Sequence, residues 1–240
     1  MIKTINLTKK YKDLVAVDNL NLQVNEGELF SLLGVNGAGK TTALKMLSCL
    51  TSPNFGEAFV DGKSILSDEV EIKKVLAISP QESAVANNLT VRENLDFITG
   101  IYGYNKLERQ GLIDKCLNDL SLTSVADKRA SKLSGGYKRR LSIAMAIITN
   151  PKVLFLDEPT LGLDVIARSD LWDYIKSLKG KMTIILTTHY LEEAENLSDR
   201  VGIMAQGKLV FVGTPSEVKQ KGNSDNFEQA FINIVKGVNL

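Results

Sequence analysis

The sequence predicts an α/β fold with a mostly parallel β-sheet, an antiparallel β subdomain and an inserted helical lobe. Short apolar runs, typical of strands buried on both faces, alternate with helical patterns, which indicates a mostly parallel sheet. The first sixty residues instead alternate apolar and polar positions between turn signals, as strands with one solvated face do. The stretch between Pro80 and Pro151 holds only helical patterns, which predicts a separate lobe.

The parallel core is expected to begin with strand 29–33, "LFSLL", followed by a helix over 40–50. Further buried strands are predicted at 75–78, 153–156 and 183–186. A helix between the last two carries Leu171, Ile175 and Leu178 on one face. After Ile203 we expect a hairpin, "MAQGKLVFVG", and then a short amphipathic helix in "NFEQAFINIV".

The helical lobe has its own start signal, because Thr90 and Glu93 fit a capping box. Two apolar stripes at helical spacing follow it. They are Leu112, Ile113, Cys116, Leu117 and Leu120, and then Leu141, Ala144, Met145 and Ile148. We therefore expect a single domain over 1–240, with a core of 1–81 and 152–240 and an inserted helical subdomain at about 82–151.

The composition excludes some functions. Of 240 residues, 44% are apolar and 24% charged, and the net charge of +1 gives no electrostatic reason to expect nucleic-acid binding. No apolar run is long enough to span a bilayer and no signal core opens the chain, so a membrane role would require a partner. Cys49 and Cys116 lie in helix-like patterns and are expected as reduced, buried thiols.

The stretch "GVNGAGKTT" at 34–42 follows a buried strand and opens a helix, as a phosphate loop does. Its glycines allow backbone N–H groups to turn toward phosphate oxygens, and the helix N-terminus adds its dipole. Lys40 is expected to reach the β- and γ-phosphates and Thr41 to ligate Mg²⁺. A glycine-rich turn that only caps a helix would not need Lys followed by Thr.

The stretch "VLFLDEP" at 153–159 is an apolar strand that ends in two acids. Asp157 is placed to hold Mg²⁺, and Glu158 to deprotonate an attacking water. A solvated pair of acids at a strand end is the alternative. The preceding buried strand, together with the phosphate loop, favours hydrolysis.

A second glycine pair occurs in "LSGGYKRR" at 133–140. Ser134 offers a hydroxyl, and Gly135 and Gly136 allow backbone N–H groups to approach an anion at the start of a helix. The basic run 138–140 is expected to be a solvated face on the outer side of that helix. The sequence therefore contains a second candidate anion site.

Seven features now follow one another in a fixed order. They are Tyr11, the phosphate loop 34–42, Gln81 after a strand, "LSGG" 133–136, "FLDEP" 155–159, "GLD" 162–164 and "TTH" 187–189. With this series the chain resembles the ATP-binding subunit of an ATP-binding cassette (ABC) transporter, over essentially its whole length. The resemblance implies a P-loop NTPase core of the ABC ATPase fold that binds ATP and Mg²⁺.

The resemblance also implies a role for each matching residue. Tyr11 would stack on adenine, since an aromatic face suits a π-system. His189, the only histidine, matches the family's switch histidine beside the γ-phosphate. Hydrolysis would use Glu158, His189, Gln81 and Lys40, and Mg²⁺ would bind at Thr41, Gln81 and Asp157. ATP would contact Tyr11, Gly34, Val35, Asn36, Gly37, Ala38, Gly39, Lys40, Thr41 and Thr42, together with Ser134, Gly135 and Gly136.

In this family the "LSGG" signature faces the γ-phosphate held by the other subunit. The resemblance therefore implies a head-to-tail pair with a second ATP-binding subunit, and a homodimer is the expected form. Asp164 matches the loop that crosses the interface. Leu161 stands where many members carry Ser, and Tyr137 where they often carry Gln or Met.

The stretches 79–95, 158–164 and 186–215 are most similar to cassettes of drug, polysaccharide, lipid or sodium exporters, the branch of the daunorubicin-resistance ATPases. This implies an ATPase that powers an integral membrane permease from the cytoplasmic, inner face of the cell membrane, with no nucleic-acid partner. The chain ends soon after its core, without the C-terminal regulatory domain of several importers, which also favours export.

Three other classes stay open. A soluble cassette protein of DNA repair or translation usually carries two cassettes or long coiled-coil insertions, which this sequence lacks. A P-loop kinase or GTPase leaves "LSGG" unexplained, and no N-K-x-D element for guanine is present. A degenerate cassette used only for binding or regulation is disfavoured by the presence of both Glu158 and His189.

Overall fold

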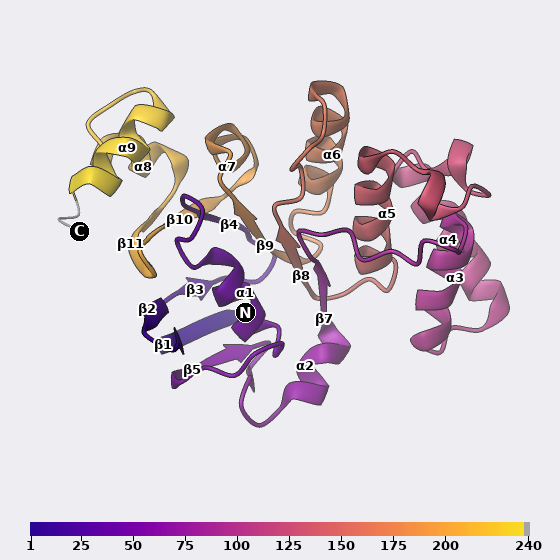
Figure 1. The fold of residues 1–240 in the computed structure, drawn as a ribbon, viewed down its shortest axis with the longest axis horizontal. Helices are drawn as coiled ribbons and strands as arrows, with labels where there is room; N and C mark the ends of the chain where they lie inside the picture. Colours follow the sequence, from indigo (N-terminus) through magenta and orange to yellow (C-terminus); the bar gives the residue numbers. More distant parts are fainter. Residues whose placement is uncertain (238–240) are drawn as a thin grey trace.

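The structure is a computed structural model that describes residues 1–237. The larger of its two β-sheets forms the centre of the molecule (Figure 1). Its strands lie in the order β11–β10–β4–β9–β8–β7. They are β4 (Leu29–Leu33), β7 (Leu76–Ser79), β8 (Val153–Asp157), β9 (Thr183–Thr188), β10 (Arg200–Ala205) and β11 (Lys208–Gly213). Neighbouring strands are parallel except for β10 and β11, which confirms the mostly parallel sheet and the predicted hairpin.

The predicted core strands lie close to their expected positions. Strand β4 coincides with residues 29–33, and every residue of β4, β8 and β9 is buried, as strands covered on both faces should be. Strand β7 begins one residue later than predicted, because Val75 is the last residue of helix α2 (Glu69–Val75). The carboxyl ends of β4, β8 and β9 therefore meet at one edge of the sheet.

The smaller sheet is antiparallel throughout and confirms the predicted β subdomain. Its strands are β1 (Ile2–Tyr11), β2 (Leu14–Leu20), β3 (Gln23–Val24), β5 (Phe55–Val60) and β6 (Lys63–Ser64). Helix α1 (Lys40–Leu47) contacts both sheets, since Leu44 and Leu47 share an apolar cluster with Val17 of β2 and Phe155 of β8. The loop before α1 is thereby placed where the two sheets meet.

Helix α1 is shorter than the predicted 40–50. Ser48 Oγ donates to Leu44 O, Cys49 has φ 58°, and Leu50 N donates to Lys45 O, so the chain turns away after Leu47. Cys49 is a free thiol as expected, but the prediction that it is buried in a helix is wrong, since it is half-buried and lies beyond the end of α1. Cys116 is buried as expected, and burial raises the pKa of its thiol to about 12.

The helical lobe lies at one end of the larger sheet, beyond β7 and β8 (Figure 1). It contains α3 (Val91–Ile101), α4 (Lys106–Asp119) and α5 (Gly135–Ile147), and Thr90 and Glu93 form the predicted capping box of α3. Over residues 82–151, all of which the structure describes, the β-structure is one isolated bridge, Thr90–Arg129. The domain boundaries at 82 and 151 remain a prediction.

The remaining helices lie on the face of the larger sheet opposite α1 and at the end of the sheet formed by β11 (Figure 1). They are α6 (Val165–Ser177), α7 (Leu191–Leu197), α8 (Pro215–Lys221) and α9 (Phe227–Gly237). Helix α9 is the predicted tail helix, and it buries Phe227, Phe231 and Ile234 beside α8 and β11. None of the helices within residues 1–237 has the length and apolarity required to cross a bilayer.

Candidate nucleotide-binding site

The phosphate loop predicted at 34–42 connects β4 to α1, and two of its glycines touch other strands closely. Gly39 has φ 102°, and a Cβ built on it would lie 2.3 Å from the carbonyl oxygen of Ala16 in β2. A Cβ on Gly34 would lie 2.4 Å from Met204 O in β10. No side chain fits at either position, so both glycines are required for the close packing of the loop against β2 and β10.

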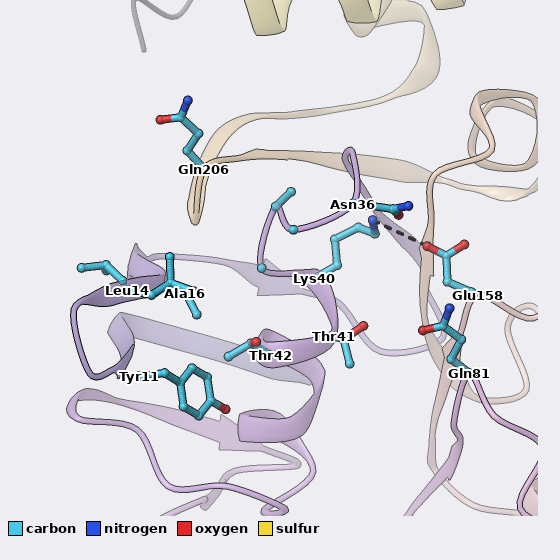
Figure 2. Close-up of a pocket in the computed structure, with 14 residues that line it drawn as sticks. Tyr11, Leu14, Ala16, Asn36, Lys40, Thr41, Thr42, Gln81, Glu158 and Gln206 are labelled. Carbon is cyan, nitrogen blue, oxygen red and sulfur yellow. Dashed lines mark ion pairs between the residues drawn. The ribbon is translucent and has the colours of Figure 1, made fainter.

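This loop forms a wall of a cavity of about 750 Å³. Figure 2 shows Tyr11 at one end and Gln81 and Glu158 at the other. The predicted residues that line it are Tyr11, Asn36, Gly37, Ala38, Gly39, Lys40, Thr41, Thr42, Gln81 and Glu158. Gly34, Val35, Asp157 and His189 lie outside the lining, and Leu14, Val15, Ala16 and Gln206 line it without having been predicted.

Two basic side chains approach the carboxylate of Glu158. Lys40 Nζ lies 3.6 Å from Oε1 (Figure 2), and His189 Nδ1 lies 2.7 Å from Oε2. Despite this short distance, His189 Nδ1 and Glu158 Oε2 make no hydrogen bond of good geometry. Burial lowers the pKa of Lys40, while Glu158 and Asp157 oppose that change. His189 is thus placed beside the predicted base although it does not line the cavity.

Asp157, at the end of β8, is 4% exposed and accepts hydrogen bonds from two hydroxyl groups. Thr41 Oγ1 donates to Asp157 Oδ1 at 3.1 Å, and Thr187 Oγ1 of β9 donates to the same oxygen. No cluster of three or more His, Cys, Asp or Glu side chains suited to a metal occurs within residues 1–237. The oxygen donors of Thr41, Asp157 and nearby Gln81 nevertheless suit Mg²⁺, which favours few carboxylates together with phosphate and water oxygens.

The sequence predicts a solvated face for the basic run 138–140, and for Arg139 this is wrong. Arg139 is 3% exposed, and its Nε and Nη2 donate to the carbonyls of Pro159 and Asp157. Burial lowers the pKa of Arg139 to about 10, although nearby acids favour the charged form, so the guanidinium is cationic at neutral pH. Helical spacing could have revealed it, since Arg139, Ser142, Ile143 and Ala146 share one buried face.

The helix after His189 carries several acidic residues, and not all of them are exposed to solvent. Helix α7 begins at Leu191, but Glu193 has no exposed surface. Its Oε1 accepts hydrogen bonds from Thr160 Oγ1 at 2.9 Å and from Trp172 Nε1 at 3.1 Å. Burial raises the pKa of Glu193. The buried carboxylate of Glu193 therefore holds Thr160, two residues after Glu158. None of the sequence motifs indicates this contact.

Replacing Glu193 with glutamine should change how stability depends on pH. Because the pKa of Glu193 is raised in the folded state, its favourable contribution is complete below the unfolded value and is lost as pH rises through the folded value. Glutamine cannot ionise, so the free energy of unfolding of Glu193→Gln relative to wild type should increase as pH rises from about 4.3 to neutrality. Urea unfolding at a series of pH values measures this.

The control for this experiment is Glu192→Gln, which alters the exposed neighbour on the same helix. Because this change leaves the buried carboxylate of Glu193 in place, the decrease in stability that Glu193 causes as pH rises should persist in this variant. If the two variants gave parallel pH dependences, Glu193 would not titrate differently in the folded and unfolded chains.

The signature residues lie away from the cavity, over a second hollow of about 320 Å³. It is lined by Ser134, Gly136, Tyr137, Arg140, Asp164, Ile166 and Ala167. Ser134 is the N-cap of α5 and Asp164 the N-cap of α6. The side chains of Val165 and Ile166, which follow Asp164 at the start of α6, are 71% and 76% exposed. The two candidate anion-binding elements predicted from the sequence therefore line two separate hollows of the single chain.

Comparison with known proteins identifies this architecture. The model of the ABC transporter family matches residues 17–161, and the chain belongs to that family. A solved dimer of the ATP-binding cassette MJ0796, in a post-hydrolysis state bound to ADP and Pi, has a TM-score of 0.82 and 28% sequence identity. That match covers 89% of this chain and 98% of the solved one, which confirms the ABC ATPase fold.

Two curated relatives are much longer than this chain. The human phospholipid-transporting ATPase ABCA3 is 42% identical over 224 residues, which are 92% of this chain and 13% of ABCA3. The probable multidrug ABC transporter ATP-binding protein YbhF of Escherichia coli is 37% identical over 241 residues. That match covers 98% of this chain and 42% of YbhF, so the similarity extends over the cassette and not over the whole relatives.

Proposed function

We propose that this chain hydrolyses ATP with Mg²⁺ as one of two paired cassettes and thereby powers a separate integral membrane permease of an exporter. The observation that carries the proposal is the meeting of Lys40, Thr41, Gln81 and Glu158 in one cavity, while Ser134 lies over a separate hollow. The first set suits phosphoryl transfer to water. The second leaves the signature free to complete the site of another subunit.

In this proposal ATP lies along the cavity, with adenine on Tyr11 and its phosphates on the loop 34–42. Loop N–H groups and the N-terminus of α1 bind the phosphate oxygens, and Lys40 neutralises the β- and γ-phosphates. Thr41, Asp157 and Gln81 would hold Mg²⁺, which would supply further charge neutralisation on the phosphates. The length of the cavity from Tyr11 to Glu158 supports this orientation (Figure 2).

Hydrolysis itself is assigned to Glu158 and His189. Glu158 accepts the proton of the attacking water, because its carboxylate faces the cavity beside the end of the phosphate loop. His189, whose Nδ1 lies 2.7 Å from Glu158 Oε2, donates a hydrogen bond to the γ-phosphate. Lys40, paired with Glu158 at 3.6 Å, exchanges this partner for phosphate when ATP binds.

Pairing of two chains would bring Ser134, Gly135 and Gly136 of one against the nucleotide of the other. The exposed apolar side chain of Ile166 in the same hollow and that of its neighbour Val165 support a protein partner there, since contiguous exposed apolar surface marks interaction sites. The dimeric form of the solved relative, 28% identical to this chain, supports the same arrangement. We propose a homodimer.

A membrane partner would bind the groove between the core and the helical lobe. This groove, of about 410 Å³, is lined by apolar side chains that include Leu50, Ile98 and Tyr102, and also by Pro80 beside Gln81. A permease segment there would sense movement at Gln81 and hold the chain at the inner face of the membrane. Because two relatives are named for phospholipid and multidrug transport, we propose an apolar or amphipathic cargo.

Co-purification from detergent-solubilised membranes tests this function. A tagged wild-type chain should capture a polytopic membrane protein, and Tyr102→Asp should lose it because a carboxylate would be desolvated in the groove. Leu107→Asp is the matched control, since Leu107 is 83% exposed on the same lobe and outside the groove. Capture of ribosomes or DNA instead would support the non-transport alternative, which the transporter names of the relatives do not favour.

A further inference from the structure

Arg139 is a buried cation bonded only to main-chain oxygens. Its guanidinium donates to four carbonyls, those of Pro80, Gln81, Asp157 and Pro159. Within residues 1–237, no carboxylate lies within ion-pair distance of it. Removing a charge from water costs several kcal/mol, so this arrangement persists only because the donors of the planar fork are well matched to these carbonyls.

Two of these carbonyls flank Glu158. Nη2 donates to Asp157 O at 2.6 Å and Nε donates to Pro159 O at 2.8 Å, so one side chain holds the peptide group before the predicted base and the second peptide group after it. Glu158 itself has φ 50°, a left-handed conformation that is unfavourable for a residue with a Cβ and persists where the surroundings enforce it. From β9, Thr187 also restrains the main chain of Glu158, whose N–H donates to Thr187 O at 3.0 Å and to Thr187 Oγ1 at 3.2 Å.

The other two carbonyls belong to the segment that follows β7. Nη1 donates to Pro80 O and, at 3.3 Å, to Gln81 O. Arg139 lies in α5, whose N-cap is Ser134. One guanidinium therefore connects the signature helix with the backbone of Gln81 and with that of Glu158.

We propose that Arg139 is a positioning residue that sets the carboxylate of Glu158 for hydrolysis according to the position of helix α5. The inference rests on the proposed role of Glu158 as the base. A movement of α5 relative to β8 stretches the bonds to Asp157 and Pro159 and releases the left-handed turn. Hydrolysis would then be coupled to the lobe through this backbone link.

Steady-state kinetics of Arg139→Lys and Arg139→Met test the proposal. Because a misplacement of about 1 Å can cost 100-fold, we expect kcat to fall by about 10- to 100-fold. The Kd of a fluorescent ATP analogue should stay within about twofold, since Arg139 does not line the cavity. Lysine should restore little, because a compact ammonium cannot reproduce the planar fork.

The matched control is Arg109→Met, in the same lobe. Arg109 Nε lies 3.3 Å from Asp96 Oδ1, and its hydrogen bond is also to Asp96, so it touches neither Gln81 nor Glu158. Its kcat should remain that of wild type even where its Tm falls. A purely structural role of Arg139 would give the two Met variants the same kcat at equal loss of Tm, which overturns the proposal.

A double-mutant cycle separates this inference from the function on which it rests. If Arg139 acts through Glu158, adding Arg139→Met to Glu158→Gln should leave the residual turnover unchanged. Additive losses, or a wild-type kcat in Arg139→Lys, would overturn the positioning role. Full turnover in Glu158→Gln alone would instead reject the assigned base. If Arg139→Met does not fold, the Lys variant and its own cycle decide the matter.

Discussion

Replacing Glu158 with glutamine should lower ATP turnover by about 10²- to 10⁴-fold, the usual contribution of a general base. The amide keeps the size of the side chain but cannot take a proton from water. ATP binding should persist, because the loop 34–42 and Lys40 are unchanged and a negative charge beside the phosphates is removed. The dimer should therefore close on ATP and fail to reopen, which size-exclusion chromatography with ATP and Mg²⁺ would detect.

The control for this variant is Glu192→Gln, which removes an exposed carboxylate three residues from His189. It should hydrolyse ATP at the wild-type rate and show no trapped dimer. Steady turnover in Glu158→Gln would mean that another group activates water. A loss of ATP binding would mean that Glu158 is needed to organise the loop, in which case its contact with Lys40 is structural.

A mixture of two inactive variants should recover activity if the signature serves the partner's nucleotide. Chains carrying Glu158→Gln and chains carrying Ser134→Arg should each form dead homodimers. In a mixed dimer, the unaltered Glu158 of one chain meets the unaltered Ser134 of the other, which restores one site. Random pairing gives about half mixed dimers with one intact site each, so about a quarter of wild-type turnover is expected.

The negative control for the mixing experiment is a mixture of chains that carry Glu158→Gln with chains that carry Lys40→Met. Both changes lie in the same cavity of a chain, so every site in the mixed dimer is defective and no recovery is expected. The chains are mixed before ATP is added, and differently tagged copies verify that mixed dimers form. Verified mixed dimers of the first pair without turnover would show that Ser134 does not act across the interface.

The parts of the site that the sequence could predict are those with a local cause. Lys40 and Thr41 follow a glycine loop on a buried strand, and Asp157 and Glu158 end another, so their meeting follows from a parallel sheet. The capping box at Thr90 is likewise set within four residues. Such features depend on neighbours in the chain, and the structure places them as expected.

The parts that the sequence could not predict depend on contacts between distant segments. Arg139 and Glu193 stand in charged runs that are typical of solvated helix faces. Only the packing of α5 against β8, and of α7 against α6 and the segment after β8, buries them. The cavity walls at Leu14 and Gln206 come from two hairpin turns without a motif. The charge of these runs therefore predicts exposed side chains, which is wrong for Arg139 and Glu193. Helical periodicity would have predicted that they are buried.

The close approach of Gly39 to Ala16 has a consequence for how such a site can diverge. The carbonyl of Ala16 belongs to the hairpin of β1 and β2, which also carries Tyr11, and the loop that begins α1 touches it with no room for a methyl group. The span between Tyr11 and Lys40 is thus set by main-chain atoms in contact. Side-chain substitutions can alter what each end of the cavity prefers, but a ligand of different length would require the two sheets to be rebuilt.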